Sequence, residues 1–327
     1  MGGRNEGLPL GLGAGTLGNL YKVVSDEHAL DTVDAAWASG IRHFDTAPFY
    51  GFGLSERRVG DALRARPRED YVLSTKVGRL LSPIPTASDR HGFVSPMPFE
   101  PAFDYSYDGV MRSYEDSLQR LGLSRIDCLY MHDLGRLTHG DGHEAVMAEA
   151  RGGLRALRDL KEQDAIGQYG LGVNEIAICD EVMAEGPLDR ILLAGRYSLL
   201  NHEPLDGFFD RCRAAGTAIT AAGVFNSGIL ATGVSGPGPH YYDYEEAPVE
   251  VMDRVRRIEA VCTAHGIPLA VAALRFVLAH PVVDDVLLGM SGEARVRRNA
   301  AMLNTDVPAA FWDEMRAESL LPAHAPT

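Results

Sequence analysis

Four side chains that could take part in proton transfer lie at, or just beyond, the ends of three consecutive apolar runs in the sequence. An aspartate, a lysine and a histidine each close one run, and a tyrosine follows the first run by five residues. Moving a hydride to or from a carbonyl carbon requires a proton to move on the oxygen, so the set points to an acid–base group with partners that tune it. The four residues are Asp45, Tyr50, Lys76 and His132.

The tyrosine needs help before it can act as a base at neutral pH, because the unperturbed pKa of a phenol is about 10. A lysine ammonium about 4 Å away contributes roughly 4 kcal/mol at an effective dielectric constant of about 20, which would bring the pKa of Tyr50 near neutrality. Burial opposes this effect, so Asp45 is expected to keep Lys76 charged and oriented. His132 is expected to hydrogen-bond the substrate oxygen.

The elements that must position these residues alternate between short apolar runs and longer amphipathic segments. This alternation predicts parallel strands with right-handed helical crossovers, and eight units predict a single α/β domain over 1–327, a (β/α)8 TIM barrel with its site at the C-terminal face. A doubly wound sheet is the alternative. The expected strands cover 8–12, 41–45, 71–76, 126–132, 166–173, 190–194, 217–222 and 283–288, and the expected helices 26–39, 55–65, 109–121, 143–163, 176–184, 204–215, 249–279 with a break near 266–268, and 292–303.

A glycine-rich turn follows the first expected strand. Gly11 and Gly13 resemble the start of a dinucleotide-binding G-x-G-x-x-G loop, but Thr16 stands where the last glycine is required. We therefore interpret the segment as a tight turn near the barrel mouth, where Gly13, Ala14 and Gly15 could border a cofactor.

Three long segments, 79–108, 133–142 and 233–248, follow expected strands and carry no clear periodicity. In a barrel they would gather as irregular loops at the C-terminal face, where active sites are built. Ser25 and Asp108 are the expected N-caps of the helices that follow them.

The composition favours a small-molecule partner. A formal net charge of -14 argues against a nucleic acid or an anionic membrane surface, and the four cysteines are dispersed as expected of reduced thiols. The first seven residues lack the apolar core of a signal peptide, so a cytoplasmic location is expected. His139 and His143 flank an aspartate, but a glycine-containing loop fixes no common face for them, so no metal site is expected. The oligomeric state stays open.

Longer motifs around the four residues resemble the aldo-keto reductase superfamily over nearly the whole chain. They are the segments 10–13, 42–47 (Arg-His-Phe-Asp-Thr-Ala), 55–60 (Ser-Glu-Arg-Arg-Val-Gly) and 126–133 (Ile-Asp-Cys-Leu-Tyr-Met-His-Asp). The resemblance implies that Tyr50 is the general acid/base, that Lys76 and Asp45 tune it, and that His132 binds the substrate oxygen.

The same resemblance implies a nicotinamide cofactor, NAD or NADP, although three usual contact positions differ. Ala194 replaces a glutamine, Ala222 replaces the tyrosine that stacks on the nicotinamide, and Gly289 replaces a lysine that meets the 2′-phosphate. The loss of that lysine favours NAD or dual use, although Arg295 and Arg298 could still pair with the phosphate. Besides the turn at 13–15 and Asp45, the implied cofactor residues are Asn174, Glu175, Gly223, Phe225 (a candidate for stacking), Asn226, Gly228, Gly289, Met290, Ser291, Arg295, Arg298 and Asn299.

The segments 172–175, 194–200 and 222–228 resemble the branch that contains D-threo-aldose 1-dehydrogenase and L-fucose dehydrogenase. This implies oxidation of the anomeric carbon of an aldose to a lactone. Pyridoxal 4-dehydrogenase or a general aldehyde reductase remains an alternative within the family, and a cofactor-sensing binding protein is the alternative outside enzymes. Loop residues that could cover a sugar or an aldehyde are Asp89, His91, Asp104, Tyr105, Tyr107, His240, Tyr241, Tyr242, Asp243 and Tyr244.

Overall fold

Eight parallel strands close into a barrel at the centre of the computed structural model, which describes residues 7–86 and 88–327. The strand order is β1-β12-β9-β8-β7-β6-β3-β2, so the first and last strands of the barrel are neighbours and the predicted (β/α)8 barrel is confirmed. The first six residues, on which the signal-peptide expectation largely rests, lie outside the described residues. The strands are β1 Leu10–Gly13, β2 His43–Asp45, β3 Val72–Val77, β6 Cys128–His132, β7 Gln168–Val173, β8 Arg190–Ala194, β9 Ala218–Ala222 and β12 Val283–Gly289.

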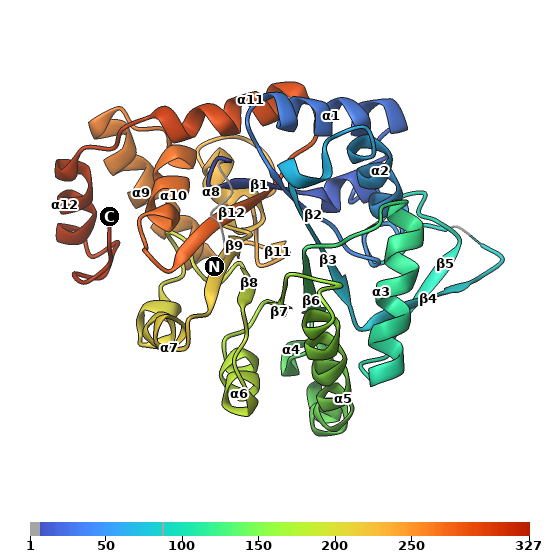
Figure 1. Cartoon of the computed structure of the whole chain (residues 1–327). Coiled ribbons are helices and arrows are strands. Elements are labelled where there is room, and N and C mark those ends of the chain that lie inside the picture. Colours follow the sequence, from blue (N-terminus) through green and yellow to red (C-terminus); the bar gives the residue numbers. More distant parts are fainter. Residues whose placement is uncertain (1–6, 87) are drawn as a thin grey trace.

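Helices surround the barrel and follow its strands along the chain (Figure 1). The predicted helix over 249–279 is indeed broken, because Gly266 adopts a left-handed conformation and Pro268 starts the next helix. The long helices are α1 Asp26–Ala38, α2 Leu54–Leu63, α3 Tyr107–Leu121, α5 His143–Glu162, α6 Ala177–Glu185, α7 Phe208–Ala215, α9 Val249–His265, α10 Leu269–Leu278, α11 Glu293–Ala301 and α12 Ala309–Ala317.

Within the described ranges, no single helix is long and apolar enough to cross a membrane. The helices α9 and α10 taken together meet the requirement of length and composition, and they are bent by 98° relative to each other.

Serine hydroxyls cap the helices α1 and α3. Ser25 Oγ accepts a hydrogen bond from the backbone amide of His28, as predicted. The predicted cap Asp108 is wrong: α3 begins two residues earlier than predicted, and Ser106 Oγ accepts from the amide of Gly109. Asp108 instead lies in the first turn, where its negative charge interacts favourably with the helix dipole.

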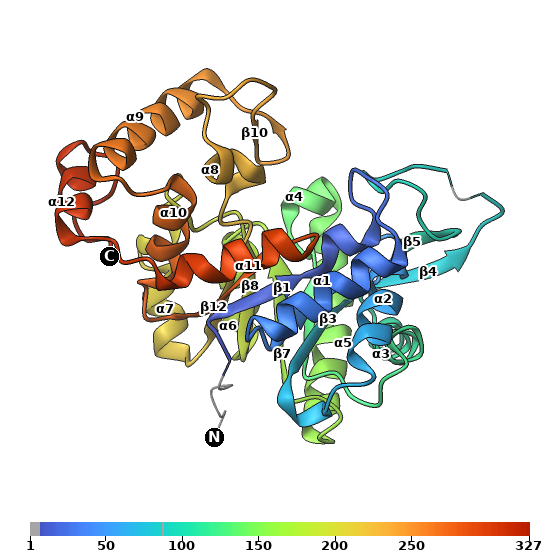
Figure 2. The same ribbon diagram turned by 90° about the horizontal axis from the view of Figure 1, so that it is seen from above.

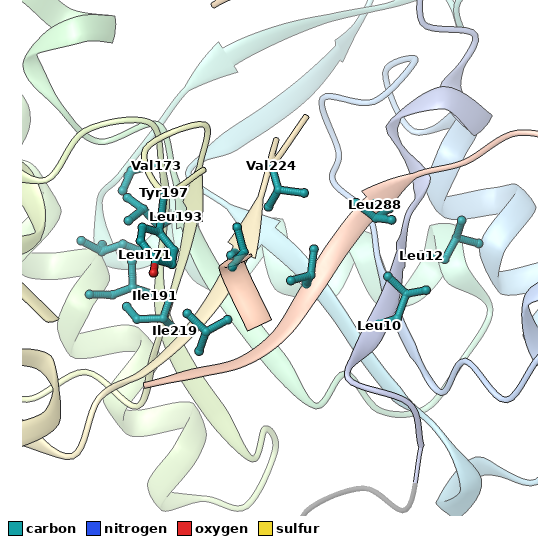
Figure 3. Packing of buried hydrophobic residues seen from close by; sticks show 14 of the residues in the cluster. Leu10, Leu12, Leu171, Val173, Ile191, Leu193, Tyr197, Ile219, Val224 and Leu288 are labelled. Atoms are coloured by element: carbon teal, nitrogen blue, oxygen red, sulfur yellow. The ribbon is translucent and has the colours of Figure 1, made fainter. Parts of the chain in front are cut away.

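The barrel strands alternate between two faces, and this alternation places the catalytic candidates. Outward side chains such as Leu12, Leu171 and Leu193 form the large apolar layer between strands and helices (Figure 3). A smaller inward cluster contains Cys128, Tyr130, Leu192 and Leu287. The residues two positions away from these on the same strands therefore also point into the barrel.

The three segments expected to be irregular contain regular structure, so that expectation is wrong in part. The first holds an antiparallel hairpin of β4 Arg79–Pro83 and β5 Phe99–Phe103, which lies on the opposite side of the barrel from α12 (Figures 1 and 2). The second holds the single-turn helix α4 Arg136–His139. The third holds a small hairpin of β10 Tyr241–Tyr242 and β11 Glu245–Glu246, and the short helix α8 Ile229–Thr232 directly precedes this segment.

Candidate active site

A buried ion pair forms the centre of the site. Lys76 Nζ donates hydrogen bonds to Asp45 Oδ2 at 2.7 Å and to the carbonyl oxygen of Thr46 at 2.8 Å. Lys76 is 2% exposed and Asp45 is 3% exposed. The pair comes from the C-terminal ends of the neighbouring strands β2 and β3, as the sequence predicted. Because both charges have partners, their burial is tolerated and their geometry is fixed.

Tyr50 lies in the loop after β2, close to both Lys76 and His132. The Lys76 ammonium is 4.8 Å from the centroid of the Tyr50 ring. The rings of Tyr50 and His132 have centroids 6.2 Å apart and are nearly perpendicular, at 88°. The structure therefore brings Asp45, Tyr50, Lys76 and His132 together at one end of the barrel.

The loop that carries Tyr50 is held by close backbone packing against the turn that follows β1. A Cβ atom on Gly18 would lie 2.6 Å from the carbonyl carbon of Tyr50, and one on Gly51 would lie 2.4 Å from the carbonyl oxygen of Gly18. Gly51 also has a φ of 64°. The two glycines thus permit a close approach that no other residue would allow.

Burial outweighs the effect of Lys76 on the pKa of Tyr50. Burial raises the pKa of Tyr50, the Lys76 ammonium lowers it less, and the net pKa lies above 10. The expectation of a phenol near neutrality from Lys76 alone is therefore wrong for these residues. Tyr50 is a protonated phenol at neutral pH unless a further positive charge stands beside it.

Lys76 behaves as predicted. Burial lowers its pKa, but the charge of Asp45, the Tyr50 phenol and the hydrogen bond to Asp45 outweigh this, and the pKa is raised to about 12. The ammonium is therefore present over the whole physiological range.

His132 is a neutral hydrogen-bonding group. Burial lowers the pKa of His132 well below its usual value, and the positive charges of Arg79 and Lys76 lower it further. Its backbone carbonyl accepts a hydrogen bond of 2.6 Å from the Tyr105 hydroxyl, which fixes the end of β6. An imidazole in this state can donate one hydrogen bond to a substrate oxygen without becoming charged.

An ion pair that the sequence analysis did not identify stands beside His132. Arg79 Nη2 donates to Asp133 Oδ2 at 2.6 Å, and the same carboxylate oxygen is 3.5 Å from His132 Nε2. The Arg79 guanidinium lies over the rings of Phe49 at 4.0 Å and Phe103 at 4.6 Å. Arg79 follows β3 after one glycine, and Asp133 directly follows β6. Their positions at strand ends are the sequence signal that could have identified them.

The ends of β1 and β12 form one edge of the mouth. Gly13 pairs with Gly289 across the two strands, and a Cβ atom on Gly289 would have only Thr16 Cγ2 near it, at 3.8 Å. Thr16 donates to the carbonyl oxygen of Met290 at 2.7 Å, and His28 Nε2 lies 3.1 Å from Ser291 Oγ. Gly13 ends β1, and Ala14 and Gly15 begin a 3-10 helix over Ala14–Gly18, which agrees with the interpretation of this segment as a tight turn.

Helix α11 follows this edge and presents its arginines outward. Arg295 and Arg298 are exposed, and neither forms an ion pair with another of the described residues, whereas Arg297 is held by Glu293 at 2.7 Å. Asn299 is buried on the inner side. This edge suits the phosphate and ribose groups of a nicotinamide dinucleotide. It offers open space beside Gly289, hydroxyl groups on Thr16 and Ser291, and the two exposed arginines of α11.

Of the two cofactor residues predicted after β7, Asn174 lies at the barrel mouth and Glu175 lies between two loops. Asn174 Nδ2 donates to the carbonyl oxygen of Ala194 at 3.3 Å, and its side chain also contacts Tyr244 from the β10–β11 hairpin. Glu175 Oε1 instead accepts from the backbone amide of Leu137 at 3.0 Å. That carboxylate ties two loops together, so its position offers no support for a direct cofactor contact.

The predicted residues after β9 shape the loop more than they face a ligand. Asn226 accepts from Ser198 Oγ, Gly223 has a φ of 62° and packs on Gly195, and Gly228 begins α8. Phe225 packs against the main apolar core, which does not favour the predicted stacking role. Ala194 and Ala222 border the inward cluster and leave room there because their side chains are small.

Several loop residues expected to cover a substrate already have partners. Asp243 pairs with Arg196 at 3.1 Å, Tyr242 donates to Asn201, and Tyr107 donates to Asp159. Tyr244 is 65% exposed and remains open to a ligand. His139 and His143 point to different partners, Tyr105 and Glu181, so they do not face a common centre.

Comparisons with known proteins agree with this geometry. The Aldo/keto reductase family model matches residues 9–319. Pyridoxal 4-dehydrogenase from Microbacterium luteolum is 44% identical, covering 95% of this chain and 94% of the relative. D-threo-aldose 1-dehydrogenase from a Pseudomonas species is 37% identical, covering 96% and 94%. The holo form of an aldo-keto reductase from Bacillus halodurans superposes with a TM-score of 0.74 at 25% identity, covering 97% and 93%.

Proposed function

Because the chain belongs to the aldo/keto reductase family and is an NAD(P)-dependent oxidoreductase, we propose that it oxidises a cyclic hemiacetal to a lactone, with Tyr50 as the acid–base group. The observation that carries the proposal is the ion pair of Lys76 and Asp45 beside the Tyr50 ring. Bound cofactor would accept the hydride from the carbon while Tyr50 accepts the hydroxyl proton.

The four residues have separate roles in the proposed reaction. His132 donates a hydrogen bond that positions the substrate oxygen, and Tyr50 takes the proton from it. Lys76 stabilises the phenolate, and Asp45 keeps Lys76 charged and in place. Since burial raises the pKa of Tyr50, the phenolate also needs the positive charge of the oxidised nicotinamide ring nearby. Oxidation is thereby coupled to the presence of the oxidised cofactor.

A hemiacetal unites the two substrate types suggested by the relatives. An aldose closes to a ring whose anomeric carbon bears a hydroxyl group, and pyridoxal closes in the same way through the hydroxymethyl group beside its aldehyde. In both cases the oxidised carbon carries one hydrogen and one hydroxyl group, so the same proton and hydride transfers give a lactone. Neither case requires water to enter the site.

Between the two substrate types, we favour pyridoxal as the first compound to test. The relative that oxidises pyridoxal is 44% identical and the aldose dehydrogenase 37%, over similar shares of the chain. The mouth carries the aromatic rings of Phe49 and Tyr244, which can stack on a pyridine ring, beside the Arg79–Asp133 pair, which can bind a phenolic hydroxyl. An aldose of the L-fucose or D-threo type is the second candidate, since the same ion pair can bind sugar hydroxyl groups.

The cofactor would lie along the β1–β12 edge. Thr16, Ser291 and the backbone of Gly289 would hold its diphosphate and ribose, and Asn174 would bind the nicotinamide amide. Arg295 and Arg298 leave room for a 2′-phosphate, while the absence of a lysine at Gly289 favours NAD. We therefore propose NAD with some use of NADP.

The test is to incubate the purified protein with NAD or NADP and pyridoxal, L-fucose or D-arabinose, and to follow the absorbance of the reduced cofactor. Mass spectrometry of the product should show the loss of two hydrogens, as expected for a lactone. A methyl glycoside of an accepted sugar, which has no free anomeric hydroxyl group, should be inert. Reduced cofactor formed only with aldehydes that cannot close a ring, giving acids that gain oxygen, would contradict the proposal.

A further inference from the structure

A chain of hydrogen bonds continues from Asp45 down the interior of the barrel, away from the mouth. Asp45 Oδ1 accepts from Ser74 Oγ at 2.7 Å, and Ser74 Oγ lies 3.0 Å from His43 Nε2. The other ring nitrogen of His43, Nδ1, is hydrogen-bonded to Asp285 Oδ2. His43 and Ser74 are both buried, so this chain is screened from water.

The strand period explains why these residues meet. His43 lies two residues before Asp45 on β2, and Ser74 lies two residues before Lys76 on β3. Side chains two apart on a strand point to the same face, so the inward position of each catalytic residue places its neighbour in the layer beneath it. Asp285 joins this layer from β12.

Counting hydrogens assigns the charge of His43. Ser74 has one hydroxyl hydrogen, and it is donated to Asp45, so Ser74 must accept a hydrogen from His43 Nε2. Burial raises the pKa of Asp285, but His43 and Arg190 lower it further, to about 2, so this carboxylate only accepts and Nδ1 must also carry a hydrogen. Both ring nitrogens then donate, which is the arrangement of an imidazolium.

The surrounding charges are consistent with a cation at this position. Arg190 Nη1 is 3.4 Å from Asp285 Oδ1, and Thr220 Oγ1 donates to the same oxygen at 2.7 Å. Burial raises the pKa of Tyr130 and, to about 12, the pKa of Cys128, so both are neutral. The buried carboxylates of Asp45 and Asp285 therefore face the cations of the layer, which are Lys76, Arg190 and His43.

We infer that His43 and Ser74 are positioning residues, in which the Nε2–H group of His43 holds Ser74 as a donor to Asp45 and so fixes the carboxylate that orients Lys76 toward Tyr50. Asp45 Oδ1 accepts from Ser74 in the layer beneath, and Asp45 Oδ2 accepts from Lys76. The positioning role rests on the proposed function of Tyr50, whereas the charge of His43 does not.

Removal of the Ser74 hydroxyl should affect Tyr50 through Asp45. A carboxylate with one donor fewer concentrates its negative charge on the side of Lys76 and draws the ammonium away from the phenol. The pKa of Tyr50 should then rise, and the rate of substrate oxidation should increase only at a higher pH than in the parent.

The first experiment is long-range proton–nitrogen correlation NMR of 15N-histidine-labelled protein at pH 7, with His43→Gln used to assign the His43 signals. Two protonated ring nitrogens on His43 would support the inference. One nitrogen without a hydrogen at pH 7 would overturn the assigned charge, whether or not the protein turns over any substrate.

The second experiment compares the pH profile of kcat for Ser74→Ala, Ser74→Thr and Ser117→Ala. Ser117 is a buried serine on α3, outside the barrel interior, and serves as the matched control. Ser74→Ala should shift the rise in rate upward by about one pH unit and lower kcat at pH 7 by about tenfold, with KM within about twofold. Ser74→Thr, which keeps the hydroxyl group, should restore most of the profile.

An unchanged pH profile in folded Ser74→Ala would overturn the positioning role, as would an equal shift in Ser117→Ala. Thermal unfolding of each variant shows whether it is folded. If the parent itself fails to oxidise any ring-forming aldehyde, the proposed function fails, and the NMR result still decides the charge of His43.

Discussion

The catalytic end of β2, β3 and β6 and the edge formed by β1, β12 and α11 lie around the same barrel mouth but differ in how their charges are satisfied. In the first region the buried carboxylate of Asp45 accepts from both Ser74 and Lys76. In the second, Arg295 and Arg298 are exposed and have no ion-pair partner among the described residues. The acid–base group is thus organised by the fold itself, whereas the cations of α11 can take their counter-charge from a ligand. Substitutions in the first region should reduce rate and stability, and those in the second should reduce cofactor affinity.

The largest effect is expected from removal of the phenolic hydroxyl group. Tyr50→Phe should lower kcat by about three orders of magnitude, since a positioned acid–base group typically contributes roughly 10² to 10⁴. Cofactor affinity, measured by quenching of intrinsic fluorescence, should stay within about twofold. Tyr21→Phe, at a tyrosine that is 68% exposed, is the matched control. Turnover in Tyr50→Phe close to that of the control would remove Tyr50 from its role.

Lys76→Met should lower kcat at pH 7 by about 10²-fold, because Tyr50 loses the cation that stabilises its phenolate. The rise of rate with pH should move to higher pH in the variant. The parent keeps this cation over the whole physiological range, because the pKa of Lys76 is raised to about 12. Stopped-flow measurement of the burst of reduced cofactor at several pH values tests this.

Stability separates this chemical effect from a folding defect. Lys76→Met leaves Asp45 buried without its ammonium, which should cost about 3 to 5 kcal/mol of unfolding free energy. The double variant Asp45→Asn with Lys76→Met should recover stability but not activity. If the double variant regained the parent's rate, the ion pair would be structural only.

The buried neutral histidines should make stability fall in mild acid. Burial and nearby positive charges lower the pKa of His132 well below 6.5 and that of His202 to about 4. Below pH 6.5 the unfolded chain therefore binds protons that the folded protein does not, and stability falls as pH drops. Each histidine contributes at most about 1.4 kcal/mol per pH unit. Urea unfolding between pH 7.5 and 5 should show the decline, and His132→Gln or His202→Gln should each reduce its slope.

The smallest effect is expected at the outer edge. Arg298→Ala and Arg295→Ala should each weaken NADP binding by up to about tenfold, because one contact to the 2′-phosphate is lost. NAD binding should change by less than about threefold, since NAD has no such phosphate. Arg297→Ala on the same helix, whose arginine pairs with Glu293, is the matched control. Equal losses for NAD and NADP would show that these arginines do not discriminate between the cofactors.

The contrast between the two regions also explains what could be predicted from the sequence. Asp45, Lys76 and His132 each end an apolar strand, and parallel strands in a barrel bring such ends together, so their convergence followed from pattern alone. His43 and Ser74 carried the same information, because they precede Asp45 and Lys76 by two residues. The strand period alone therefore places them in the layer beneath the catalytic residues.

Loop geometry and the balance of burial against charge could not be predicted in the same way. Asp133 has a φ of 52°, and this turn aims its carboxylate at Arg79 and His132. The β4–β5 hairpin was missed because its strands contain Pro83 and Pro101, which are unfavourable in strands. The pKa of Tyr50 depends on how much apolar and charged surface surrounds it, which the order of residues along the chain does not specify.

The most direct test of the central claim is the fate of the carbon-bound hydrogen. Pyridoxal or an accepted aldose, deuterated at the carbonyl or anomeric carbon, would be oxidised by the parent protein in ordinary water, and the reduced cofactor examined by NMR. The account predicts one deuterium at C4 of the nicotinamide for each lactone formed, because the hydrogen moves as a hydride. Deuterium released to the solvent, or a product that forms without reduction of the cofactor, would contradict it.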